Sequence, residues 1–200
     1  MGKPISNIEV YGIDKAFKTS KYPMSIDVND CTDTLTQNIK KLAHAKSGSG
    51  HDNFLKGIIV QFDLTFTIKA WTEAERYHFF DIVSSQSTMH RISKFELNDN
   101  SFSEYTDIKI KKRLKELIDA YNRDFPDNIT IDKIEENYKK ERYLELLYSV
   151  PVGLKLTAGI TTNYQQLKTI YFQRKNHRLP EWRLFCKQLE DLPYSKELIL

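Results

Sequence analysis

Residues 62–69 constrain the fold of this 200-residue chain more than any other segment. Large apolar residues occupy every second position and polar residues fill the positions between them, in the run Phe62-Asp-Leu-Thr-Phe-Thr-Ile-Lys69. Because successive side chains of a β-strand point to opposite faces, this alternation predicts a strand with one buried and one polar face. We expect the strand to extend over residues 58–70.

Apolar residues spaced three and four positions apart predict helices in other parts of the chain. The longest are expected from Asp107 to Arg123, with a lysine-rich outer face, and from about Ile131 to Tyr148. We interpret these two as a helical insert at about residues 107–148 in a single domain of residues 1–200. After Pro180, another amphipathic helix is expected to bury Trp182, Phe185, Cys186 and Leu189.

Shorter elements complete the predicted fold. A helix over residues 35–42 is expected to be capped by Asp30 or Thr32, and one from Thr72 to residue 82 is expected to carry His78 in the core. Strands are also predicted over residues 5–13 and 91–97. A few strands and several long helices, without regular alternation of the two, predict an α+β fold with a mixed sheet.

Composition argues against several classes of protein. The net charge of +3, from 30 basic and 27 acidic residues, is too small to indicate a nucleic-acid-binding protein. No apolar run approaches the roughly 20 residues that a membrane span requires, and the first residues lack a signal-peptide pattern. Cys31 and Cys186 lie far apart and have no spacing typical of a zinc site. We therefore expect a reduced cytoplasmic protein without a bound metal or a membrane partner.

An asparagine and an arginine share the apolar side of a helix predicted over residues 163–174. Leu167, Ile170 and Tyr171 follow Asn163 at steps of four, seven and eight, and Arg174 follows it at a step of eleven. Burying an amide and a guanidinium is costly unless both are hydrogen-bonded. Their partners are expected to be either other parts of the protein or a bound ligand.

The segment from Pro151 to Trp182 resembles the C-terminal signature of the flavin-dependent thymidylate synthases. In that family an asparagine that begins a ligand-lining helix follows a proline by twelve residues, and an arginine follows eleven residues later. Pro151, Asn163 and Arg174 match this spacing without a gap, and Trp182 matches with one extra residue. The run Gly50-His-Asp-Asn-Phe-Leu-Lys-Gly57, which precedes the strand predicted over residues 58–70, is similar to the family's Gly-His loop.

The chain departs from the family at its cationic positions. Gly57 replaces a histidine, Leu147 stands where an arginine is expected, and the family's Arg-His-Arg triplet falls at Phe80, Asp81 and Ile82. Each lost charged hydrogen bond is worth roughly 1.5–3 kcal/mol, so these changes should weaken binding of flavin adenine dinucleotide (FAD). We therefore do not expect authentic thymidylate synthesis.

The resemblance implies a fold like that of the flavin-dependent thymidylate synthases, a homotetramer with sites between subunits, and a pyrimidine nucleotide similar to dUMP as ligand. In the family, reduced FAD carries hydride to dUMP after methylene transfer from a folate. By position, the nucleotide-binding residues would be Arg174, Arg91 and Ser87. The residues that would contact FAD are Asn163, Ser85, His51 and His177.

Three functions stay open at this point. The first is a diverged flavin-dependent transferase acting on a pyrimidine deoxynucleotide, and the second is an inactive relative that binds a nucleotide or a protein. The third is a nucleic-acid-binding protein that uses the basic residues of 109–115 and 175–183, which the interspersed acidic residues disfavour. If Arg174 awaits a ligand, its guanidinium is expected to be solvated and its truncation to leave folding mostly intact.

Overall fold

A computed structural model of the chain describes residues 2–46, 48–126 and 133–200. These residues form two compact units. The first, which we call the helical unit, comprises Phe66–Thr72 and Ser85–Thr157. The second, which we call the sheet unit, comprises Gly2–Thr65, Glu73–Ser84 and Ala158–Leu200. The expectation of a single domain stays a prediction.

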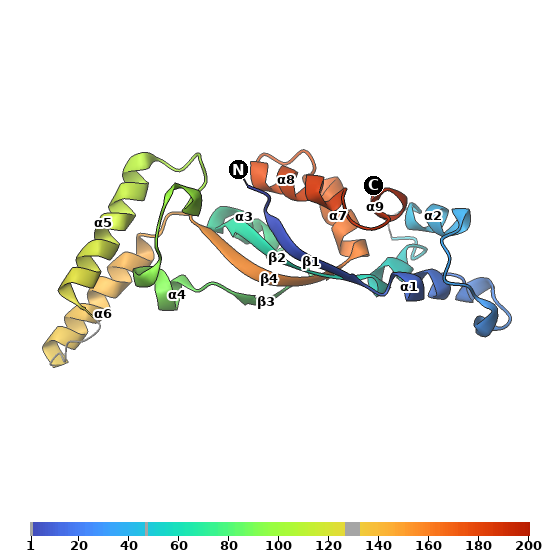
Figure 1. The fold of residues 1–200 in the computed structure, drawn as a ribbon, viewed down its shortest axis with the longest axis horizontal. Helices are drawn as coiled ribbons and strands as arrows, with labels where there is room; N and C mark the ends of the chain where they lie inside the picture. The colour runs from blue at the N-terminus through green and yellow to red at the C-terminus, as the bar shows by residue number, and fades with distance from the viewer. Residues whose placement is uncertain (1, 47, 127–132) are drawn as a thin grey trace. The chain divides into compact units, whose positions relative to one another are not determined.

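Four strands form one sheet in the order β1-β2-β4-β3 (Figure 1). β1 pairs antiparallel with β2, so that Ile5 lies opposite Leu64 and Val10 opposite Val60. Phe62 and Leu64 are buried as the alternation in the sequence predicted. The strands are β1 Ile5–Tyr11, β2 Ile59–Thr67, β3 Phe80–Ser85 and β4 Lys155–Asn163.

In the sheet unit, helices α7 and α8 pack against each other and lie on one side of the sheet (Figure 1). The ring of Phe185 on α8 lies 6.0 Å from that of Phe62 on β2 and 6.1 Å from that of Phe80 on β3. Trp182, Cys186 and Leu189 of α8 are also buried, which confirms the predicted stripe. The helices here are α1 Ile13–Thr19, α2 Gln37–Ala43, α7 Tyr164–Arg174, α8 Pro180–Leu189 and α9 Ser195–Leu198, with 3-10 helices at Tyr22–Met24, Val28–Asp30 and Asn53–Gly57.

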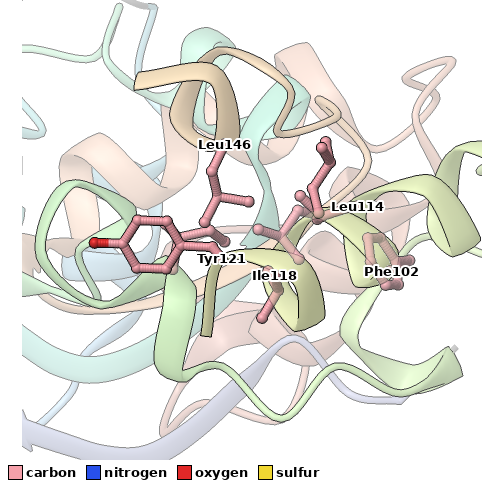
Figure 2. Packing of buried hydrophobic residues seen from close by; sticks show 8 residues of the cluster. Phe102, Leu114, Ile118, Tyr121 and Leu146 are labelled. Carbon is pink, nitrogen blue, oxygen red and sulfur yellow. The ribbon is translucent and has the colours of Figure 1, made fainter. Parts of the chain in front are cut away.

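The helical unit has its own core, which is built around α5 (Ile108–Asp124) and includes Leu146 of α6 (Lys133–Tyr148). Figure 2 shows Leu114, Ile118 and Tyr121 of α5 packed with Leu146 and Phe102. Asp107 begins α5 by accepting hydrogen bonds from the backbone nitrogens at 109 and 110. Both helices of the expected insert are thus present, although residues 131–132 lie outside the described residues. The unit also contains α4 Thr88–Arg91 and 3-10 helices at Ile92–Lys94 and Asp99–Ser101.

Two predicted elements are wrong. The segment expected to be a helix over residues 72–82 contains the end of helix α3 (Ile68–Ala74) and the beginning of β3, and His78 is exposed. Helix α3 begins early because the Thr67 hydroxyl accepts a hydrogen bond from the backbone nitrogen of Ala70. The strand expected over residues 91–97 is replaced by the end of α4 and a 3-10 helix.

One predicted cap is also wrong. The residue that caps α2 is Thr36, whose hydroxyl accepts from the backbone nitrogen of Ile39 at 3.3 Å, and not Asp30 or Thr32. The 3-10 helix at Val28–Asp30 uses a different carboxylate, that of Asp27, as its own cap. The capping rule therefore identified the correct residue types, but the helix begins later in the chain than expected.

Candidate functional site

Asn163 joins strand β4 to helix α7. Its side-chain oxygen accepts a hydrogen bond from the backbone nitrogen of Gln166 at 2.9 Å, which caps the helix, and the residue is only 9% exposed. The cap uses only the oxygen of the amide. Within the described parts of the chain, the Asn163 Nδ2 group has no hydrogen-bond partner. Asn163 therefore caps α7 and retains an amide donor.

Arg174 lies at the other end of α7 and is held by side chains of the sheet unit. Its Nε donates to Tyr77 Oη at 2.6 Å. Its Nη1 contacts Glu73 Oε2 at 3.1 Å and His177 Nε2 at 2.7 Å. The guanidinium carbon also lies 5.1 Å from the ring centroid of Trp182, within range of a cation–π interaction. We call these five residues the Arg174 cluster.

The Arg174 cluster corrects one expectation from the sequence. An arginine that awaits a ligand would be solvated, but the Arg174 side chain is only 11% exposed and forms an ion pair with Glu73, which is 22% exposed. The sequence left two kinds of partner open for Arg174, other parts of the protein or a bound ligand. The structure shows protein partners for most of the guanidinium. Arg174 therefore has a structural role.

Part of the guanidinium nevertheless stays unused. An arginine side chain carries five N–H donors. The Nε donor contacts Tyr77, and the two Nη1 donors contact Glu73 and His177. In residues 2–46, 48–126 and 133–200, Arg174 Nη2 has no hydrogen-bond partner. The internal contacts thus orient the guanidinium and leave one edge with two donors for a carbonyl or an oxyanion.

His177 contacts the same guanidinium as a neutral imidazole. Burial lowers the pKa of His177, and the positive charge of Arg174 lowers it further, while Glu73 and Glu181 act in the opposite direction without outweighing them. His177 Nδ1 also accepts a hydrogen bond from the backbone nitrogen of Leu179 at 3.2 Å, and a neutral imidazole has only one acceptor nitrogen. A protonated ring would place two cations in contact, so His177 lies against Arg174 as an uncharged ring.

Tyr77 is a member of the cluster that sequence reasoning missed. Its hydroxyl accepts from Arg174 Nε and donates to Gln173 Oε1 at 2.9 Å, and its ring lies 6.0 Å from that of Trp182. Glu73 was missed as well. The only signal in the sequence is that Glu73 and Tyr77 lie four residues apart, as two residues on one side of a helix do. The helix predicted for this segment was interpreted from its apolar residues and not from these two polar ones.

His51 lies in a different part of the sheet unit. It is exposed and lines a cavity of about 960 Å³ together with side chains that include Lys21, Cys31 and Phe54. The next residue, Asp52, is 6% exposed. Hydroxyl, amine and aromatic side chains in this cavity are suited to a ligand with both polar and apolar parts.

The loop that carries His51 is attached to α7 by Asp52. The carboxylate of Asp52 accepts from Lys168 Nζ at 2.9 Å and from Gln165 Nε2 at 3.0 Å, and Lys168 also donates to the carbonyl of Ala43. Burial by itself would raise the pKa of Asp52, but the hydrogen bonds from Lys168 and Gln165 outweigh it and lower the pKa. The helix that begins at Asn163 therefore also positions the His51 loop.

The remaining predicted residues lie in the helical unit. Ser85 is exposed at the end of β3, and the Ser87 hydroxyl caps α4 by accepting from the backbone nitrogen of His90 at 3.3 Å. Arg91 is exposed, and its side chain contacts no partner among the described residues. Because these three belong to a different unit from the Arg174 cluster, their membership of one common site stays a prediction.

The positions of the expected cationic triplet supply no cation. Phe80 is 5% exposed and belongs to the aromatic core. Asp81 is exposed and brings a negative charge, while Ile82 is 44% exposed. Gly57 carries no side chain, and Leu147 packs against the core of the helical unit. These residues do not fit the diphosphate of FAD, which requires cationic or amide donors.

Three further properties bear on the class of protein. Among the described residues, no helix is long and apolar enough to cross a membrane, and no group of three or more His, Cys, Asp or Glu side chains is arranged to hold a metal ion. Cys31 and Cys186 are both free thiols. Burial raises the pKa of Cys186 to about 12, so this thiol is a packed core residue and not a nucleophile.

The architecture is that of the flavin-dependent thymidylate synthases, an α+β fold. The crystal structure of flavin-dependent thymidylate synthase ThyX from Helicobacter pylori, complexed with FAD and dUMP, matches with a TM-score of 0.67 over 97% of this chain and 98% of that chain, at 15% identity. A second structure of Helicobacter pylori ThyX with FAD and dUMP has the same TM-score and identity, over 95% of this chain and 94% of that chain. No protein-family model and no curated protein sequence matches the chain. The likeness therefore lies in the fold.

Proposed function

We propose that this chain binds a pyrimidine nucleotide similar to dUMP through the Arg174 cluster, within a homotetramer, and that it does not synthesise thymidylate. The proposal combines the fold with one local observation. Arg174 Nη2 offers two donors at the end of α7, and three internal contacts fix their direction. Fixed donors bind more tightly than mobile ones because little side-chain entropy is lost on binding.

A pyrimidine base is the ligand that suits this edge best. Its ring carbonyls are uncharged acceptors, and a planar ring can be held by donors of fixed geometry. ThyX of Helicobacter pylori, which has this fold, was crystallised with dUMP. Arg91 and Ser87 are proposed to meet the phosphate of the nucleotide.

FAD is proposed to bind weakly. Phe80 is fixed in the core, Asp81 adds a negative charge, and Gly57 offers no side chain, so the contacts that a diphosphate needs are reduced. Asn163, His51, His177 and Ser85 stay the candidates for flavin contact. An inactive relative that binds only the nucleotide is the second candidate function, and the same departures favour it.

Calorimetric titration with dUMP tests the nucleotide site. Arg174→Lys keeps a cation that can pair with Glu73 but removes the Nη2 donors, and it should weaken binding by roughly 1.5–3 kcal/mol, which is about 10–150-fold. Lys175→Gln is the matched control, because it removes the charge of an exposed neighbour outside the cluster and should leave affinity unchanged. Equal affinity of Arg174→Lys and the wild type, or no binding to the wild type, would contradict the proposal.

Visible absorption of the purified protein tests the flavin. We expect little or no retained FAD after purification and recovery of flavin bands only at high added FAD. Stoichiometric yellow flavin in the purified protein would contradict weak binding and favour an active enzyme. An equal nucleotide affinity with and without FAD would favour the second candidate, a nucleotide-binding relative without redox function.

A further inference from the structure

Glu73 is the carboxylate that contacts the Arg174 guanidinium. Its Oε2 lies 3.1 Å from Arg174 Nη1, and Arg76 Nη1 lies 4.0 Å from the same oxygen. The two arginines differ in setting, since the Arg76 side chain is 73% exposed and the Arg174 side chain only 11%. Charge on Arg76 is therefore screened by water, whereas Arg174 and Glu73 form a partly buried pair.

Pairing with Glu73 changes what the free edge of Arg174 can bind. A guanidinium without a counter-ion attracts anions strongly, because a unit charge acts at long range where the dielectric is low. With Glu73 beside it, the positive charge is compensated, and an arriving anion is also repelled by the carboxylate. The Nη2 hydrogens still donate to a neutral carbonyl, which gains a directional hydrogen bond and meets little repulsion.

We propose that Glu73 is a specificity-determining residue, which makes the Arg174 edge select an uncharged carbonyl-bearing ring over an anionic one. This inference rests on the proposed function, since it names the charge state of the base that the site accepts. Glu73 would act through Arg174, by reducing its charge without blocking its Nη2 donors. The expected ligand class is a neutral pyrimidine-2,4-dione ring, and a ring that has lost a proton is expected to be rejected.

Two ligands that differ in ring charge test the inference. They are dUMP and the dUMP analogue whose base is the barbiturate anion, which share the sugar and the phosphate. Calorimetry should show that the wild type prefers dUMP by at least about tenfold, because the anionic ring meets the Glu73 carboxylate. In Glu73→Gln this preference should fall by about tenfold or more, chiefly because the barbiturate analogue binds more tightly.

Two further variants separate charge from structure. Glu73→Gln keeps an acceptor oxygen for Arg174 Nη1, so the guanidinium should stay oriented. Glu73→Asp retains the charge and should retain the preference for dUMP. Glu75→Gln removes the same charge from an exposed residue that forms no hydrogen bond or ion pair among the described residues, and it should behave like the wild type. The same preference in Glu73→Gln and the wild type would overturn the inference while leaving the nucleotide site intact.

The remaining outcome is that the wild type binds neither nucleotide, which would overturn the proposed function. Glu73 is then tested with free barbiturate anion as the probe and the melting temperature as the readout. Barbiturate should stabilise Glu73→Gln but neither the wild type nor the double variant Glu73→Gln/Arg174→Gln. Such a result upholds control of charge at Arg174 by Glu73, and equal melting shifts in all three proteins would overturn it.

Discussion

The ammonium group of Lys168 lies 2.9 Å from the carboxylate of Asp52, and both side chains are nearly buried, at 13% and 8% exposure. This ion pair joins the middle of α7 to the loop that carries His51. Since α7 also carries Asn163 and Arg174 at its two ends, one helix positions most of the candidate residues in the sheet unit.

We predict that Asp52→Asn destabilises the protein by about 3–5 kcal/mol at pH 7, because the Lys168 ammonium stays buried without its counter-ion. Chemical denaturation measures the change, and the exposed Asp191→Asn serves as a control that should alter stability little. The pKa of Asp52 is lowered below its ordinary value of 3.8, so its contribution is fully present above that pH and is lost as pH falls through the lower pKa of the folded state. A stability difference between wild type and Asp52→Asn that disappears already at pH 6 would contradict this assignment.

Truncating Arg174 should now cost stability as well as affinity. Arg174→Ala removes the ion pair to Glu73, the hydrogen bond to Tyr77 and the packing on Trp182, and we expect a loss of about 3–5 kcal/mol. The exposed neighbour Lys175→Ala should change stability by less than about 0.5 kcal/mol. Thermal and denaturant unfolding measure this loss of stability. A melting temperature of Arg174→Ala equal to that of the wild type would mean that Arg174 has no structural role and faces only a ligand.

The chain should not convert dUMP to thymidylate with folate and reduced FAD. The physical reason is that Phe80, Asp81 and Ile82 provide no cation where the family has three polar or cationic side chains. An anaerobic assay of thymidylate formation, with Helicobacter pylori ThyX run in parallel, measures the turnover. Sustained turnover comparable with that of the parallel enzyme would show that other residues replace the missing contacts.

The family's Arg-His-Arg triplet should be tolerated at two of the three positions where it falls in this chain. Asp81→His and Ile82→Arg change exposed side chains and should leave the melting temperature nearly unchanged while increasing FAD retention. Phe80→Arg should destabilise the protein by about 3–5 kcal/mol, because it removes an aromatic ring packed against Phe62 and Phe185 and buries a charge. A Phe80→Arg variant as stable as the wild type would mean that this position faces a ligand.

A homotetramer is expected in solution. The reason is the resemblance to a family that binds its ligands between subunits, together with the complete matching fold. Light scattering at micromolar concentration, with and without dUMP, measures the assembly. A single monomeric mass under both conditions would contradict the tetramer, and it would leave the Arg174 cluster to bind its ligand within one chain.

Local pattern in the sequence determined several elements correctly. The alternation that begins at Phe62 predicted β2, although the strand ends at Thr67 and the last residues expected in it, 68–70, begin α3. Spacing of three and four predicted α5, α7 and α8 with their buried sides. The step of eleven from Asn163 to Arg174 predicted one helix for both residues, and the structure places Asn163 at the end of β4 as the cap of α7 and Arg174 at the last position of α7. These predictions succeeded because they depend on the fixed periods of the strand and the helix, which any single segment displays by itself.

Tertiary structure decided the rest. Phe80 and its neighbours follow an apolar spacing that a helix would also satisfy, and packing of Phe80 between Phe62 and Phe185 made the segment a strand. Strand β4 was not anticipated, although Leu156, Ala158 and Ile160 alternate with Thr157, Gly159 and Thr161 and the same alternation appears in their burial. Two of the partners of Arg174, Glu73 and Tyr77, lie about 100 positions earlier in the chain. A hydrogen bond over such a separation leaves no local period in the sequence, so only the folded chain could reveal that the arginine proposed to bind a ligand is also held by the protein's own side chains.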